Sequence, residues 1–281
     1  MFYLSDIYKR TGDEKLLASL QSACDFMKWF VHPDGSIGGE YASRGTKFAY
    51  PAAFEMLAEH SSSAAAIAQH LRQCAAEGKG VSAWQMDSWN LLPMLNNLLF
   101  AANYAPNLKE LQPLPWLTEN AIGIFQHAGF VSVSTDKCVA IISGSMGGTI
   151  KLWDKNGQLL FEDCGYYYKK NTLSFSNQGH SSFELAETGT SIELTSVSSF
   201  RKVQSIRFSS WKFLGFRLFT LIFGKFPKIS KIIKSVLVNR LIYKTDKSPG
   251  RLIRKIKISQ DHTISIQDCL TDLQVAPRPL P

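Results

Sequence analysis

Apolar positions in the first hundred residues recur at the spacing of an α-helix. Leu4, Ile7 and Tyr8 fall on one side of the opening segment, which predicts a helix from the first residues onward. The next apolar stripe begins after Asp13, a residue type that commonly starts a helix. In all, the pattern predicts five helical segments, at about residues 1–10, 14–31, 51–60, 63–78 and 87–103.

The period changes after a proline-marked stretch at 104–116. Phe130–Ser134 alternates apolar and polar residues, and the turn Asn156-Gly157 joins two further runs of strand type, which is a strong hairpin signal. The predicted strands lie at 130–134, 139–142, 149–153, 158–161, 173–176, 182–185, 191–197, 203–208, 252–258 and 263–267. Many short strands separated by turns favour an antiparallel sandwich. We therefore predict an α+β multidomain chain with a helical domain at 1–104, a linker at 105–118 and a β-sandwich at 119–281.

Positive charge is concentrated in one segment. The 281-residue chain has a net charge of +8, and residues 201–257 hold 16 of its 31 lysines and arginines but one of its 23 acidic residues. Within that segment, apolar residues from Ile229 to Leu241 form a helical stripe flanked by lysines. We predict a basic helical insertion at about 211–245, which either packs on the sandwich or lies on an anionic membrane surface. No nucleic-acid-binding module accompanies the charge, so no nucleic-acid partner is predicted.

The loop between the second and third helices carries the densest chemistry. Asp34, Glu40, Tyr41 and Arg44 supply an acceptor, a titratable acid, a phenol and a fixed cation within a glycine-bearing stretch. Tyr50 stands at the end of this loop, before Pro51. Loops held by rigid helices are a common place for catalytic groups. A connector whose acids cap the next helix is the alternative interpretation.

This order of elements resembles the heparinase II/III-like polysaccharide lyases, which form an (α/α) toroid followed by a β-sandwich. The residues that carry the resemblance are Asp34-Gly35-Ser36, Glu40, Ser43–Thr46, Tyr50-Pro51, Gly147–Trp153 and Asp163–Tyr166. The resemblance implies a partial toroid, because a family toroid has more helical hairpins than this chain holds. It also implies an acidic, uronate-containing polysaccharide as partner and no cofactor.

β-Elimination on a uronic acid needs a group that neutralises the carboxylate, a base for the C5 proton and an acid for the departing oxygen. Family members use a tyrosine and a histidine as acid and base. By resemblance, the candidate catalytic residues are Tyr41, Tyr50, Arg44, His180 and Glu40, and the candidate substrate-binding residues are Asp34, His32 and Trp84. The chain departs from the family where a tyrosine-histidine pair usually follows the Asp-Gly-Ser loop, since Gly45, Thr46 and Lys47 stand there.

Two other functions compete with elimination. A glycoside hydrolase would use two of Asp34, Glu40 and Glu55 as paired carboxylates, which must then converge on one cleft. A non-catalytic module would hold a glycan, for example in surface-polysaccharide assembly at a membrane. The remaining histidines lack metal-ligand spacing, so no metal site is predicted. The five widely spaced cysteines favour free thiols over paired ones, with a bridge between Cys138 and Cys164 as a minor alternative.

Overall fold

The protein is described here by a computed structural model. The described residues are 1–42, 45–105, 113–118, 120–170, 172–177, 181–188, 191–202, 211, 214–215, 217–218, 247–259, 261, 263–273 and 275–280.

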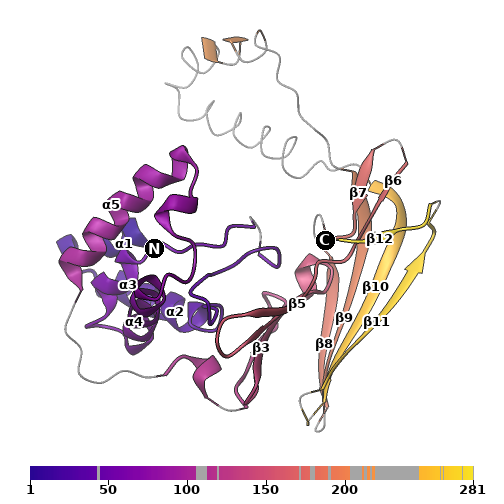
Figure 1. The fold of residues 1–281 in the computed structure, drawn as a ribbon, viewed down its shortest axis with the longest axis horizontal. Coiled ribbons are helices and arrows are strands. Elements are labelled where there is room, and N and C mark those ends of the chain that lie inside the picture. Colours follow the sequence, from indigo (N-terminus) through magenta and orange to yellow (C-terminus); the bar gives the residue numbers. More distant parts are fainter. Residues whose placement is uncertain are drawn as a thin grey trace.

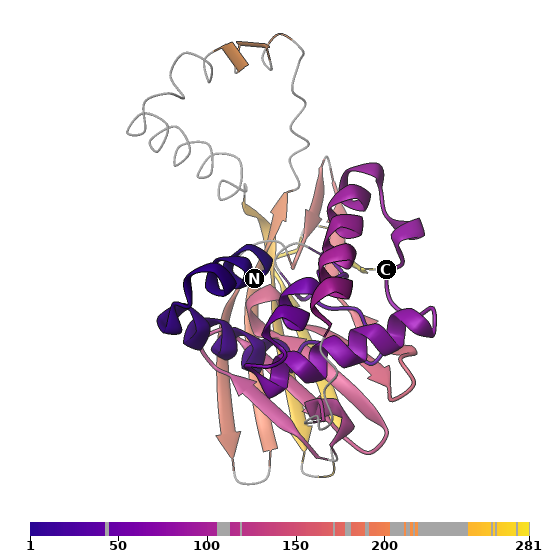
Figure 2. The same ribbon diagram turned by 90° about the vertical axis from the view of Figure 1, so that its left-hand side faces the viewer.

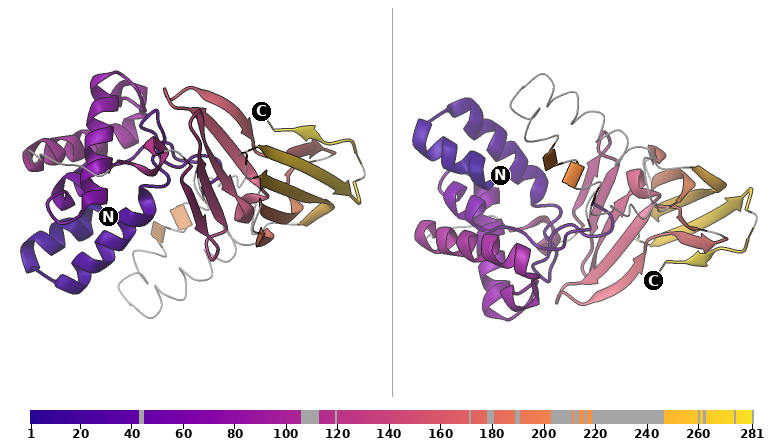
Figure 3. Two further views of the ribbon diagram at one scale, coloured as in Figure 1. Left: turned by 90° about the horizontal axis from the view of Figure 1, so that it is seen from below. Right: turned by 90° about the horizontal axis from the view of Figure 1, so that it is seen from above.

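Three layers build the molecule: helices, a five-stranded sheet and a seven-stranded sheet (Figure 1). The helices lie in front of the sheets when the molecule is seen from its helical side (Figure 2). Views from below and above show the same order, with the five-stranded sheet in the middle (Figure 3). The fold is therefore α+β, with antiparallel sheets.

The helices begin and end where the sequence provides capping groups. Asp13 accepts hydrogen bonds from the backbone N–H groups of Lys15 and Leu16, and Ser61 and Asp87 cap later helices in the same way. The first helix ends at Thr11 and is capped by Gly12, whose φ of 66° is left-handed. The described α-helices are α1 (Phe2–Thr11), α2 (Glu14–Met27), α3 (Ala52–Leu57), α4 (Ser62–Ala76) and α5 (Ser88–Tyr104). Short 3₁₀ turns occur at η1 (Ala83–Gln85), η2 (Pro115–Leu117) and η3 (Gly144–Met146).

Strands of the middle sheet follow one another in chain order. They are β1 (Ile122–Phe125), β2 (Phe130–Ser134), β3 (Cys138–Ser143), β4 (Thr149–Asp154) and β5 (Leu159–Asp163). The predicted Asn-Gly hairpin is confirmed between β4 and β5, where Gly157 has a φ of 93° and Asp154 N–H donates to the Gln158 carbonyl at 2.9 Å.

The outer sheet has the order β11-β10-β9-β7-β6-β12, and β8 also pairs with β9. Its strands are β6 (Tyr166–Lys169), β7 (Leu173–Phe175), β8 (Ser182–Thr188), β9 (Ser191–Lys202), β10 (Lys247–Ser259), β11 (Ile264–Thr271) and β12 (Arg278–Pro279). The long strands β9 and β10 pair from Ser191 and Ser259 to Arg201 and Lys247.

The centre of the middle sheet is buried on both faces, which explains the uninterrupted apolar run Val139–Ile142 in β3. Ala140 and Ile142 pack with outer-sheet residues such as Ile256, whereas Ile141 packs against the loop that follows α2. Strand β4 alternates in the same way. Ile150 faces the outer sheet, and Lys151 and Trp153 face the loop.

One arginine connects the two sheets. Arg254 on β10 has a fully buried side chain and makes two hydrogen bonds to each of two carboxylates, those of Asp163 on β5 and Asp268 on β11, at 2.7–3.0 Å. It also donates to the Gly148 carbonyl at 3.2 Å. A Cβ at Gly148 would lie 2.5 Å from the Arg254 Cδ, so only glycine lets this side chain pass.

Helix α5 leaves much of its surface uncovered. No charged residue occurs in Ser88–Tyr104, and the buried residues of this helix are Met94, Asn97 and Ala101. Trp89, Leu92 and Leu99 are 88%, 73% and 67% exposed. A helix that is apolar on most sides is normally buried. Within the described part of the chain, nothing covers this face.

Several predictions need correction or fall outside the described residues. The sequence pattern missed β1, β6 and β12, which are short. The predicted strand at 203–208 and nearly all of the predicted basic insertion at 211–245 lie outside the described residues. All five cysteines are free thiols, so the alternative of a Cys138–Cys164 bridge is wrong. Cys138 on β3 pairs with Asp154 at the end of β4, whereas Cys164 follows Asp163 of β5, which pairs with Ile150 near the start of β4.

Candidate functional site

The candidate site is the loop between α2 and α3. Val31 and Ile37 form an isolated antiparallel bridge, and Gly35 turns the chain between them with a φ of 79°. A Cβ at Gly35 would lie 2.6 Å from the Cβ of Cys74 on α4, so the turn depends on glycine. The loop thus lies directly between the helical layer and the middle sheet.

Four side chains of this loop form a continuous chain of hydrogen bonds. The Tyr41 hydroxyl lies 2.7 Å from His32 Nε2, and His32 Nδ1 lies 2.7 Å from the Ser36 hydroxyl. Ser36 donates to the Asp34 carboxylate at 2.6 Å through its hydroxyl and at 2.8 Å through its backbone N–H. The Gly38 N–H donates to the Tyr41 oxygen at 3.1 Å.

The Asp34 carboxylate lies at one end of this chain of hydrogen bonds and can only accept. It therefore fixes which atom donates in each of the other bonds. Because Asp34 accepts the Ser36 proton, the Ser36 oxygen must accept from His32, which places the neutral ring's proton on Nδ1. His32 Nε2 is then unprotonated and accepts the Tyr41 hydroxyl proton. The arrangement therefore presents an unprotonated ring nitrogen and a protonated phenol side by side.

Burial holds both partners in their neutral forms. His32 is 1% exposed and stacks on the Trp153 ring at 4.0 Å. Burial and the positive charge of Lys151 lower the pKa of His32 to about 3, against the opposing charge of Glu40. Burial also raises the pKa of Tyr41, which is 2% exposed. Proton transfer from the phenol to the ring is therefore strongly disfavoured at rest.

The His32 shift predicts that the protein loses stability in acid. Unfolded histidine takes up a proton below pH 6.5, whereas folded His32 does so only near pH 3, so the unfolded state binds more protons between these values. Unfolding free energy should fall by about 3 kcal/mol between pH 7 and pH 4 from this residue alone. Denaturant titrations across this range measure the effect. A His32→Asn variant should lose most of it, and an unchanged slope in that variant would contradict the assignment.

An ion-pair cluster lies next to the hydrogen-bond chain. Glu40 pairs with Lys47 at 2.9 Å and with Lys151, and Lys151 pairs with Glu162 on β5 at 2.8 Å. Burial opposes the charge of Glu40, but hydrogen bonds from Lys151 and Lys47 outweigh it and lower the pKa of Glu40 to about 2. Lys47 is half-exposed, whereas the Lys151 side chain is 3% exposed. Lys47 is thus the cation of this cluster that a solute can reach.

The other predicted residues do not join this group. The Tyr50 ring contacts Phe48, and Tyr50 takes no part in the hydrogen bonds that join Tyr41, His32, Ser36 and Asp34. Trp84 is 96% exposed and lines a separate cavity. Arg44 and His180 lie outside the described residues. The structure therefore joins His32, Asp34, Glu40 and Tyr41, and it leaves Tyr50 and Trp84 apart from them.

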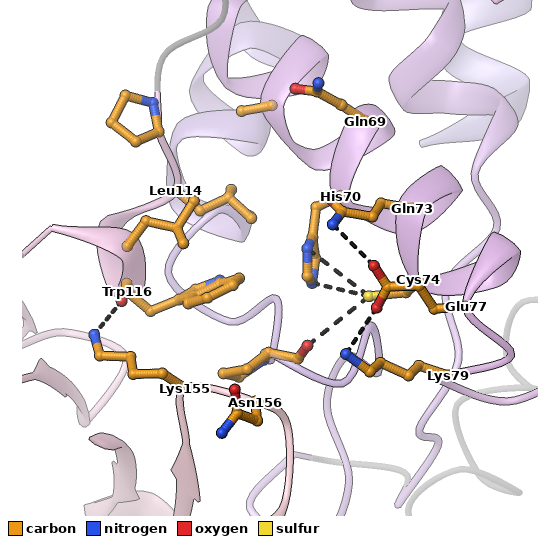
Figure 4. A pocket seen from close by; sticks show the side chains of 14 residues that line it. Gln69, His70, Gln73, Cys74, Glu77, Lys79, Leu114, Trp116, Lys155 and Asn156 are labelled. Atoms are coloured by element: carbon orange, nitrogen blue, oxygen red, sulfur yellow. Dashed lines mark hydrogen bonds and ion pairs between the residues drawn. The ribbon is translucent and has the colours of Figure 1, made fainter. Parts of the chain in front are cut away.

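Two cavities flank the loop. The first, which we call the polar cavity, has a volume of about 390 Å³ and lies between α4, η2 and the β4–β5 hairpin (Figure 4). Trp116 and His70 both line it, and their rings meet edge to face with centroids 5.0 Å apart. Lys79 pairs with Glu77 at its edge, and Lys155 donates to the Trp116 carbonyl. The second, the apolar cavity, has a volume of about 460 Å³ and lies between α3, α4, α5 and the segment before η1.

Sequence reasoning gave no role to several residues of this site. Ser36, Lys151 and Trp153 belong to the stretches that carry the family resemblance, but nothing local shows that Lys151 and Trp153 meet a loop more than a hundred residues earlier. The alternating residues of β4 gave one indication in the sequence, because they place Lys151 and Trp153 on the same face of the strand.

Metal and membrane features are not found in the described parts of the chain. These residues contain no cluster of three His, Cys, Asp or Glu side chains that could hold a metal ion, and none of their helices has the length and apolar character to cross a bilayer. Comparisons of the chain with protein-family models, curated proteins and solved structures find no match. Its function must therefore be inferred from its residues and their geometry.

Proposed function

We propose that this protein acts on an acidic, uronate-containing polysaccharide as a lyase, with His32 and Tyr41 as base and acid. The observation that carries the proposal is the 2.7 Å hydrogen bond between His32 Nε2 and the Tyr41 hydroxyl. A tyrosine and a histidine are the acid-base pair that the resemblance to heparinase II/III-like lyases implies. The chain supplies them from Tyr41 and the upstream His32, although the family's usual later position lacks them.

At rest His32 Nε2 is unprotonated and Tyr41 is protonated, which are the states in which a base and an acid begin the reaction. Unprotonated Nε2 of His32 removes the C5 proton, the C–H electron pair forms the C4–C5 double bond, and the C4–O4 bond breaks as Tyr41 donates its proton to O4. Afterwards His32 carries an extra proton and Tyr41 lacks one. A single transfer along their hydrogen bond restores both, and it is downhill because burial lowers the pKa of His32 and raises the pKa of Tyr41.

A cation must neutralise the uronate carboxylate so that the C5 proton becomes acidic. Lys47 is half-exposed at the edge of the ion-pair cluster and could serve in this role, as could Arg44 in the same loop. His32 and Tyr41 are buried, so the loop around them must open before substrate can reach them. Gly38 and Gly39 both have positive φ values and would absorb that movement.

We also propose that the two sheets form a β-sandwich and that the helices form part of an (α/α) toroid. Outer-sheet and middle-sheet residues share one apolar core, which supports a β-sandwich. The uncovered apolar face of α5 supports a helical array larger than the five helices described, as a partial toroid requires.

Hydrolysis by paired carboxylates has less support. Asp34 is engaged by Ser36, Glu40 by two lysines, and Glu55 by Arg72 on the far side of the loop. Glu55 lines the apolar cavity, and neither Asp34 nor Glu40 lines either cavity. Within the described residues, no two of these three acids therefore line one of the two cavities together.

A non-catalytic glycan-holding module is the second candidate, because the polar cavity combines an aromatic ring with amides and a cation. Trp116, Gln69, Gln73 and Lys79 all line it (Figure 4). Such sites hold sugars by stacking and hydrogen bonding. Attachment of the basic segment at 211–245 to an anionic membrane remains a prediction outside the described residues.

Incubation with a panel of uronate polymers tests the proposal. The expected result is ultraviolet absorbance from the C4–C5 double bond of the product, with none from a matched neutral glycan that lacks the carboxylate. New reducing ends without that absorbance would indicate hydrolysis instead. Binding without any cleavage across the panel would overturn the lyase proposal in favour of the glycan-holding module.

A further inference from the structure

The ion-pair cluster beside the hydrogen-bond chain contains the contacts of a carboxylate-binding site. Lys47 Nζ lies 2.9 Å from Oε1 of Glu40, and Lys151 Nζ pairs with Oε2. Lys47 comes from the loop between α2 and α3, whereas Lys151 comes from β4 in the middle sheet. Charge-assisted hydrogen bonds to both oxygens hold a carboxylate strongly. The fold therefore brings two lysines from distant parts of the sequence together on one acid.

A tight turn presents Glu40 to these lysines. The Ala42 N–H donates to the Gly39 carbonyl at 2.9 Å, and Glu40 lies between these two residues. Gly39 has a φ of 106°, which favours glycine over any residue with a side chain. A Cβ at this position would also lie 3.4 Å from Lys151 Nζ. The glycine thus lets the backbone run close beside the buried cation, so that the side chain of the next residue reaches it.

The Glu40 carboxylate can be exchanged for another one. Its side chain is 34% exposed and that of Lys47 is 48% exposed, so their contact lies at the surface of the protein. Exposed ion pairs contribute little to stability, and breaking one costs correspondingly little. Lys151 would keep Glu162 at 2.8 Å, whereas Glu40 is the acidic partner of Lys47 within the described parts of the chain. An incoming carboxylate would therefore restore the same balance of charge.

We propose that Lys47 and Lys151 form the subsite for the glycan carboxylate, and that Glu40 fills this subsite as an internal substitute while no glycan is bound. A carboxylate on a sugar offers the same two oxygens as Glu40 and takes its place, and Glu40 then turns toward solvent. Identification of the sugar as a uronate rests on the proposed lyase function. The exchange of carboxylates itself does not require any bond of the glycan to break.

The position of the subsite agrees with the proposed chemistry. Trp153 follows Lys151 by two residues on the same face of β4, and it stacks on the His32 ring with centroids 4.0 Å apart. Burial and the positive charge of Lys151 both lower the pKa of His32, so the lysine and the ring are near neighbours. In a uronate, C5 is bonded to the carboxylate carbon. A carboxylate held at Lys151 therefore brings the C5 proton to the side of the site where its base lies.

Binding of methyl glucuronide to the full chain, followed by NMR titration, tests the subsite without any need for cleavage. Glu40→Gln keeps the shape of the side chain but removes the competing charge, so its affinity for methyl glucuronide should exceed that of the unchanged protein by roughly fivefold or more. Methyl glucoside, which lacks the carboxylate, should show no such gain. Adding Lys47→Met to Glu40→Gln should abolish the gain, because the exposed cation is lost.

Glu193→Gln is the matched control. Glu193 pairs with Lys257 at 3.2 Å on the outer sheet, so this variant also removes a carboxylate from an exposed lysine. It should bind methyl glucuronide no better than the unchanged protein. Circular dichroism of each variant confirms that it is folded.

Three results would overturn the subsite: no gain in Glu40→Gln, an equal gain in Glu193→Gln, or a gain that survives the addition of Lys47→Met. The outcome is separable from that of the lyase proposal. If Glu40→Gln shows the gain but no uronate polymer is cleaved, the subsite stands and the lyase proposal fails. If uronate polymers are cleaved but Glu40→Gln shows no gain, the lyase proposal stands and the subsite fails.

Discussion

Replacing Tyr41 with phenylalanine is expected to lower the rate of glycan elimination by roughly 10²- to 10⁴-fold. The variant keeps the ring that packs on Phe130 but removes the proton that would go to the leaving oxygen. It also removes the hydrogen bond through which, in the proposed reaction, the proton would return from His32. Initial rates from product absorbance at several pH values measure the effect.

Tyr50→Phe is the matched control, because Tyr50 belongs to the same loop and is the other phenol predicted from the sequence. Its ring contacts Phe48 and lies apart from the hydrogen-bond chain, so its loss should change the rate little. Both substitutions remove one hydroxyl, and Tyr41→Phe should cost about 1–2 kcal/mol of stability from its lost hydrogen bonds. A rate that falls in Tyr50→Phe and persists in Tyr41→Phe would reverse the assignment.

Replacing Arg254 with alanine is expected to destabilise the fold by about 3–5 kcal/mol. The side chain is fully buried and neutralises both Asp163 and Asp268, so its removal leaves two carboxylates without a cation and a void between the sheets. The pKa of Arg254 is raised, because the two carboxylates outweigh the opposing effect of burial. Chemical denaturation gives the change in unfolding free energy.

Lys257→Ala provides the comparison on the same strand. Its ion pair with Glu193 spans 3.2 Å, and both side chains are 51% exposed, so the expected loss is about 0–1 kcal/mol. Similar losses for the two variants would show that Arg254 does not hold the sheets together. A triple variant with Arg254→Met, Asp163→Asn and Asp268→Asn should recover much of the stability, since no buried charge is then left unpaired.

The sequence by itself determined the local elements. The helices α2, α4 and α5 were predictable because their apolar period and their caps, Asp13, Ser61 and Asp87, act within a few residues. The β4–β5 hairpin was predictable because Asn156-Gly157 favours its turn without help from the rest of the chain. Strand β6 was missed because its tyrosines carry no alternation, and its pairing with β7 and β12 decides its conformation.

Only the tertiary structure decided what the loop residues do. The sequence placed Asp34, Glu40 and Tyr41 in one loop, but their protonation depends on burial under the middle sheet and on Lys151, which is distant in the chain. His32 became the partner of Tyr41 because the turn at Gly35 folds the loop back on itself. Helix periods and turn residues report interactions over a few positions, whereas desolvation and charge pairing depend on which distant surfaces meet. That is why the sequence indicated the site and the structure assigned its protons.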